Sequence, residues 1–140
     1  MSLRAIPLLA IAFILYNVIV LFAGSAPPNA VLASRIFEIP MLHADPSVTW
    51  IFTWGDFLML SVLVLLFIEL LKSTYTSTAS LLDHGLSMVL FVVCLVEFLL
   101  VKQAATSVFF FITMATLIDV IAGYTIGIRV ARRDLSIGGE

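Results

Sequence analysis

The chain has 140 residues, of which 62% are hydrophobic and 11% are charged. Soluble domains average about 45–50% apolar and about 25% charged residues, so this composition excludes a soluble fold. Only seven residues are basic and the formal net charge is -2, which excludes a nucleic-acid-binding protein. We therefore expect an all-α, polytopic protein whose partner is the lipid bilayer, folded as a single membrane domain over residues 1–140.

Four apolar runs each approach the length of about 20 residues that a membrane-spanning helix needs. They are Ile6 to Gly24, Thr49 to Leu71, Leu81 to Val101 and Ala105 to Ile128. The first run is longer than the apolar part of a signal peptide, about 7–15 residues, so it is interpreted as a retained helix. The sequence predicts a bundle of four transmembrane helices, with an outer loop over residues 25–48 and a tail over residues 129–140.

The basic residues predict the orientation of the bundle. An even number of crossings places both termini on one side of the membrane. That side collects five basic residues, Arg4, Lys72, Arg129, Arg132 and Arg133, against Arg35 and Lys102 on the other. The positive-inside rule then places both termini in the cytoplasm, and we expect a bacterial inner membrane. The three C-terminal arginines are expected to contact anionic lipid headgroups.

The outer loop and the start of the second run predict contacts with the membrane surface. Residues Ala30 to Leu42 are about half apolar, which is typical of a short element in the headgroup layer. Trp50 and Trp54 are four residues apart, so we expect them on one helix face as an aromatic anchor.

Short connections predict which helices are neighbours. The polar loop Ser73 to Ala79 and the connection Lys102 to Ala104 favour antiparallel packing of the second helix on the third and of the third on the fourth. Ser80 followed by Asp83 resembles a capping box. Asp83 and His84 are therefore interpreted as a helix start.

The last apolar run carries a stripe of small residues around one acid. Ala115, Asp119, Gly123 and Gly127 recur at every fourth position, which predicts close packing of another helix on this face. An Asp at the bilayer centre costs roughly 2.5–3.5 kcal/mol on insertion scales, so Asp119 is expected to face that contact.

Other polar residues are candidates for a buried network. Asn17 is predicted near the membrane midplane as the partner of Asp119, either as interhelical hydrogen-bond glue or as part of a protonatable relay. Asp56 and Glu97 are predicted at similar depth on neighbouring helices. They are interpreted either as an entry site for protons or cations, or as partners of the nearby Lys102 and Arg35 at the interface.

No cofactor or metal is expected. Cys94 is the single cysteine, so no disulfide can form within the chain. His43 and His84 are predicted on opposite sides of the membrane and cannot ligate one iron. The sequence has no HExxH motif, no phosphate-binding loop and no Gly-x-Ser-x-Gly motif.

These observations favour a small non-enzymatic membrane protein that assembles through its helix faces, as an accessory subunit of a membrane complex or with copies of itself. The alternative is a small proton- or cation-coupled transporter or channel that uses Asp119, Glu97 and Asp56. A weaker alternative is a membrane enzyme that binds lipid or quinone and uses Asp83 and His84.

Overall fold

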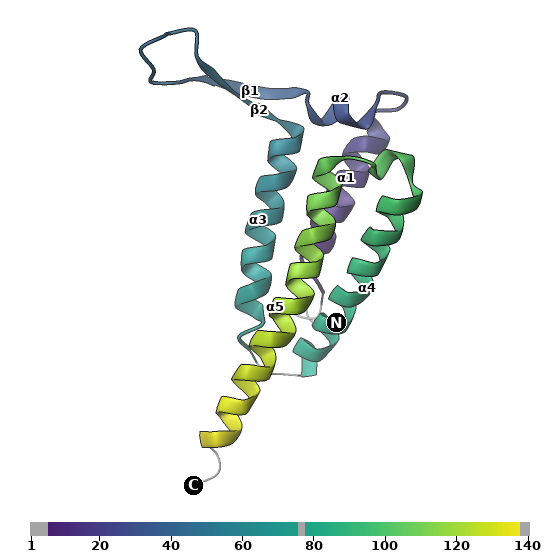
Figure 1. The fold of residues 1–140 in the computed structure, drawn as a ribbon, viewed down its shortest axis with the longest axis vertical. Coiled ribbons are helices and arrows are strands. Elements are labelled where there is room, and N and C mark those ends of the chain that lie inside the picture. The colour runs from purple at the N-terminus through teal and green to yellow at the C-terminus, as the bar shows by residue number, and fades with distance from the viewer. Residues whose placement is uncertain (1–5, 76–77, 138–140) are drawn as a thin grey trace.

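A computed structural model describes residues 6–75 and 78–137 of the chain, and Figure 1 shows that they are mostly helical. In chain order the elements are α1 (Leu9–Phe22), α2 (Pro28–Leu32), β1 (Arg35–Pro40), β2 (Thr49–Thr53), α3 (Trp54–Lys72), α4 (Thr78–Leu100), the 3₁₀ turn η2 (Lys102–Ala104) and α5 (Ser107–Ile137).

Three of the helices, α3, α4 and α5, are long and apolar enough to cross a membrane. This agrees with the membrane class that the composition predicts. The first apolar run forms a shorter helix, α1, which has 14 residues. Its length is about 21 Å at 1.5 Å per residue, against a hydrocarbon layer about 30 Å thick.

Helix α5 lies at the centre of the bundle and packs against α1, α3 and α4 (Figure 1). Its buried side chains include Phe109, Ile112 and Ala115. They share one hydrophobic core with buried residues of the other three helices: Leu9, Ala12 and Tyr16 of α1, Leu58 and Val62 of α3, and Leu90 and Cys94 of α4. The predicted packing of the second apolar run (residues 49–71, α3) on the third (residues 81–101, α4) is wrong, because α5 lies between α3 and α4 over the described residues. A short loop joins two helix ends but does not require the rest of the helices to touch.

The start of α3 differs from the prediction. Thr53 is the N-cap: its hydroxyl accepts from the Asp56 main-chain N–H, and the Asp56 side chain accepts from the Thr53 main-chain N–H, which completes a capping box. The residues before the cap form β2, so Trp50 lies on a strand and Trp54 on the first turn of the helix. The prediction that these two tryptophans share one helix face is therefore wrong.

Two other helix ends also lie outside the predicted limits. Helix α4 begins at Thr78, so Ser80 falls inside the helix, and the side chain of Ser80 lies outside the described residues. Helix α5 continues to Ile137 and projects beyond the bundle (Figure 1). The predicted polar tail is helical as far as this residue.

The outer loop folds into a short helix followed by an antiparallel hairpin. Helix α2 lies close to the start of α3, where a Cβ atom on Gly55 would sit 3.3 Å from the carbonyl oxygen of Leu32. Strands β1 and β2 pair with Phe37 opposite Phe52 and Ile39 opposite Trp50. The hairpin projects sideways from the end of the bundle (Figure 1), and every residue of β1 is exposed.

Candidate functional site

A cluster of buried and half-buried ionisable side chains lies where α3 ends, α4 begins and the middle of α5 passes between them. It consists of Glu69 and Lys72 from α3, Asp83 and His84 from α4, and Asp119 from α5. We call this set the charged cluster. Its three carboxyl residues are almost inaccessible to solvent, with exposed fractions of 1% for Glu69, 4% for Asp83 and 3% for Asp119.

Lys72 connects three parts of the bundle. Its Nζ atom lies 3.0 Å from a carboxylate oxygen of Glu69 and 3.1 Å from one of Asp83, and it donates to the Ile6 carbonyl oxygen at 3.0 Å. Glu69 and Lys72 are three residues apart on one helix, a spacing that lets their side chains pair. The second oxygen of Glu69 accepts from the main-chain N–H of Leu8, one of the N–H groups that a helix start leaves without a partner. The charged cluster therefore also anchors the start of α1.

Asp119 lies beside the ion pairs without joining them. It is within electrostatic range of Asp83, His84 and Lys72, and the Ser87 side chain from α4 faces it. Asp119 Oδ2 and Ser87 Oγ are both buried and have no hydrogen-bond partner among the described residues. Buried polar atoms are rarely left in this state, so one atom of the cluster, Asp119 Oδ2, and the neighbouring Ser87 Oγ stand out from the satisfied ion pairs.

The small-residue stripe on α5 accommodates the side chain of His84. A Cβ atom on Gly123 would lie 2.8 Å from His84 Cε1 and 2.9 Å from Nδ1, and one on Gly127 would lie 3.5 Å from Nε2. The imidazole ring is also 5.2 Å from the ring of Tyr124, measured between centroids. The stripe was predicted to receive the backbone of another helix, but its glycines instead make room for a buried histidine of the same chain.

The structure does not bring Asn17 to Asp119. The Asn17 amide donates to the Phe13 carbonyl oxygen at 3.1 Å, within its own helix. The neighbouring residue, Tyr16, has its hydroxyl 2.8 Å from Thr106 Oγ1. Asp119 lies 13 residues after Thr106, about 20 Å along α5. The predicted partnership is therefore wrong.

Asp56 and Glu97 are also kept apart. The Asp56 carboxylate belongs to the capping box of α3, while Glu97 is half-buried on α4, on the other side of α5. Arg35, one of the predicted partners of these acids, pairs with Glu38 at 2.6 Å. Lys102 is exposed. The prediction of a shared site requires α3 and α4 to be neighbours at this depth, whereas α5 separates them.

Several buried hydroxyl groups were not among the predicted site residues. Thr113 and Thr116 are each 1% exposed and donate to carbonyl oxygens of their own helix, and Tyr16 donates to the Gln103 carbonyl oxygen at 2.7 Å. Ser87 completes this set on α4. The signal that could have found the threonines is their spacing from Asp119, because positions 113, 116 and 119 lie on one side of a helix.

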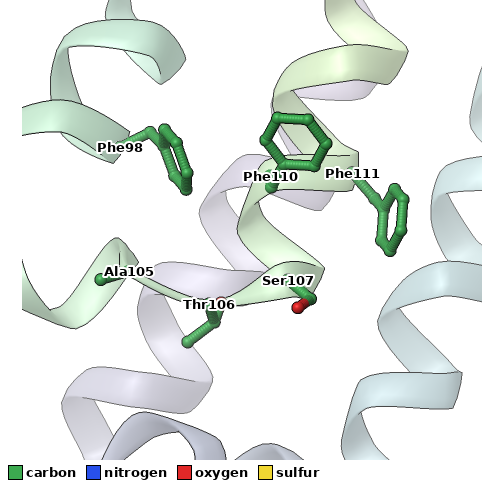
Figure 2. A pocket seen from close by; sticks show the side chains of 6 residues that line it. All are labelled: Phe98, Ala105, Thr106, Ser107, Phe110 and Phe111. Atoms are coloured by element: carbon green, nitrogen blue, oxygen red, sulfur yellow. The ribbon is translucent and has the colours of Figure 1, made fainter.

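A pocket of about 390 Å³ lies at the opposite end of the bundle from the charged cluster. Figure 2 shows its lining, with Phe98 from α4 facing Phe110 at the start of α5, and Phe111 beside it. Ala105, Thr106 and Ser107 form the rest of the lining. None of these six residues is charged and three are phenylalanines, so the lining is mostly apolar.

The remaining predicted residues lie apart from the charged cluster. His43 is in the exposed loop of the hairpin, and Arg129, Arg132 and Arg133 are exposed on the end of α5. Among residues 6–75 and 78–137, no group of three or more His, Cys, Asp or Glu side chains could hold a metal ion. Comparison with protein-family models, with curated proteins and with solved structures gives no match to this chain.

Proposed function

We propose that this chain is a small, non-enzymatic, four-helix integral membrane protein that acts by assembling with another membrane protein or with a second copy of itself. The observation that supports this proposal is the exposed hairpin formed by β1 and β2. It lies outside the bundle (Figure 1), and every residue of β1 is exposed.

One face of the hairpin is almost entirely apolar. The pairing register places Phe37, Ile39, Trp50 and Phe52 on the same side of the two strands. The Phe37 and Phe52 rings stack with centroids 4.7 Å apart, and Trp50 meets Phe52 edge-on at 5.6 Å. We call these four side chains the aromatic face. A two-stranded hairpin is marginally stable by itself in water, so this face needs a covering surface.

A protein partner suits the hairpin better than anionic lipid does. Binding to anionic headgroups relies on free basic residues, whereas Arg35, the basic residue in the strands, pairs with Glu38. The outer edges of the two strands carry main-chain N–H and C=O groups that hydrocarbon cannot satisfy but an added strand can. These features favour a subunit that docks through the hairpin.

Photocrosslinking in native membranes tests this proposal. A photoreactive amino acid at Trp50 should give a discrete protein adduct, and an adduct of twice the 15.3 kDa chain mass would identify a second copy. The same residue at Leu60, which is 53% exposed on α3, is the matched control and should give only lipid adducts. If position 50 also gave lipid adducts alone, the hairpin would be a membrane anchor and the assembly proposal would fail.

The transporter alternative requires Asp119, Glu97 and Asp56 to line one path through the bundle. Asp56 lies in a helix cap, Glu97 lies across α5 from it, and Asp119 lies in the charged cluster. The one observation that favours a proton-linked role is the charged cluster itself.

A further inference from the structure

We propose that Asp119 and Ser87 form a proton-binding site inside the bundle, which exchanges its proton with the surroundings of the cluster at the α3 end. This inference is independent of the assembly proposal, because it concerns a different part of the molecule. It rests on the contacts, the burial and the charges of the five cluster residues and of Ser87.

Ser87 is 1% exposed and Asp119 is 3% exposed, and Ser87 Oγ and Asp119 Oδ2 are the two buried side-chain atoms without a hydrogen-bond partner among the described residues. A carboxylate can only accept hydrogen bonds, whereas a protonated carboxyl can also donate one. A serine hydroxyl can donate or accept. Small side-chain rotations would thus let the Ser87 hydroxyl donate a hydrogen bond to ionised Asp119 or accept one from protonated Asp119.

The charged residues around Asp119 come from two neighbouring helices. Glu69 and Lys72 come from α3, and Asp83 and His84 come from α4. Lys72 is already shared between Glu69 and Asp83, at 3.0 and 3.1 Å. With all three carboxyls ionised, the cluster would have a net charge of -2 with neutral His84 and -1 with charged His84. An uncompensated buried charge is costly, and a proton on a carboxyl removes it.

The charged cluster reaches the protein surface through its ion pairs. The Lys72 side chain is 19% exposed, so the ion pairs reach solvent while Asp119 does not. His84 lies against Gly123, one helical turn beyond Asp119. Uptake forms an O–H bond on Asp119 and removes one negative charge. On release the electron pair stays on the carboxylate and the proton passes to water.

A metal ion is a poorer occupant of this site. No group of three suitable ligands occurs among the described residues, so the cluster does not offer the coordination shell that a divalent ion needs. Sodium ions remain a competing occupant that the experiment has to separate from a proton.

Infrared spectroscopy of the full chain in nanodiscs tests the site directly. The native protein should show the carbonyl band of a protonated carboxylic acid that disappears as pH rises. Asp119→Asn should remove this band, Asp119→Glu should shift it, and Ser87→Ala should retain it at a changed frequency, because its hydrogen-bond partner is lost. The frequency change in Ser87→Ala is a readout that a purely structural role for Ser87 would not produce.

Asp45→Asn is the matched control. Asp45 is exposed in the hairpin loop, and hydrogen bonds from the hydroxyl and main-chain N–H of Ser47 hold the pKa of its carboxyl below the usual value. Its protonation therefore occurs at lower pH, and removing it should leave the Asp119 band unchanged. A band that persists in folded Asp119→Asn would overturn the proposal. So would loss of the band on adding sodium chloride, but not choline chloride, at constant pH.

Discussion

At the residue scale, a side chain from α4 lies directly against the glycines of α5. The His84 imidazole occupies the space that a Cβ atom on Gly123 would need, whereas Gly127 leaves an ordinary contact distance of 3.5 Å. The two glycines have the same sequence spacing to the rest of the stripe, but they differ in what an added methyl group would meet.

Alanine substitutions at the two glycines should therefore have different effects. Gly127→Ala should be neutral or stabilising by up to about 1 kcal/mol, because alanine favours the helix and no clash arises. Gly123→Ala should lower the free energy of unfolding by about 1–3 kcal/mol relative to Gly127→Ala, because His84 has to move. Unfolding in detergent measures both values. Equal stability of the two variants would mean that His84 does not occupy this space.

Lys72 should be the basic residue on which the bundle depends most. Lys72→Met leaves Glu69 and Asp83 buried without their cation, which typically costs about 3–5 kcal/mol. Lys102→Met is the matched control, and its effect should be small because Lys102 is exposed. Adding Glu69→Gln and Asp83→Asn to Lys72→Met should recover part of the lost stability. Lack of any recovery in unfolding measurements would contradict the ion-pair assignment.

The sequence predicts local relations between residues better than it predicts the partners of each side chain. The pairing of Glu69 with Lys72 follows from their three-residue spacing, and the burial of Asp119 follows from the small-residue stripe. The approach of Ser87 and His84 to α5 could not be derived in the same way. Spacing identifies a face on one helix, whereas the residue that covers this face depends on how another helix is rotated.

At the element scale, the start of α3 shows why an apolar run does not fix a helix boundary. Residues 49–53 are as apolar as the helix that follows, but they form a strand paired with β1. Hydropathy alone cannot separate a short strand from a helical turn. The boundary is given instead by Thr53 and Asp56, whose spacing is that of a capping box.

Loss of this cap should destabilise α3 measurably. Thr53→Ala removes the hydroxyl that accepts from the Asp56 N–H at 3.2 Å, and loss of an N-cap typically costs about 1 kcal/mol. Thr49→Ala is the control, because Thr49 lies in β2 outside the cap and is exposed. Thermal unfolding followed by circular dichroism should show a lower midpoint for Thr53→Ala alone. The same midpoint for both variants would contradict a stabilising cap.

At the scale of the whole molecule, the approximate positions of the three long apolar helices could be predicted, but not their arrangement. Hydropathy located α3, α4 and α5, because each is long and apolar enough to cross a bilayer. Connection lengths suggested a simple sequence of neighbours, and this fails because α5 lies between α3 and α4. The central position depends on side-chain complementarity along the whole of α5, which a linear pattern does not contain.

The orientation of the bundle is the prediction that belongs to this scale. The end of α5 projects from the bundle at the end that also holds Lys72, and it carries the exposed residues Arg129, Arg132 and Arg133 (Figure 1). At the other end, the described residues include only two basic side chains, Arg35 and Lys102. The positive-inside rule then places the end of α5 in the cytoplasm.

Reporter fusions measure this orientation. A reporter after residue 140 should be cytoplasmic, and one inserted in the hairpin loop between Met41 and Val48 should be external. Arg35→Gln with Lys102→Gln should leave both results unchanged, because these residues are on the side with fewer positive charges. Replacing the three C-terminal arginines should instead weaken the bias, since they supply most of the charge at that end. A native C-terminus found outside would reverse the assignment, and the proton-binding site would then open toward the external side.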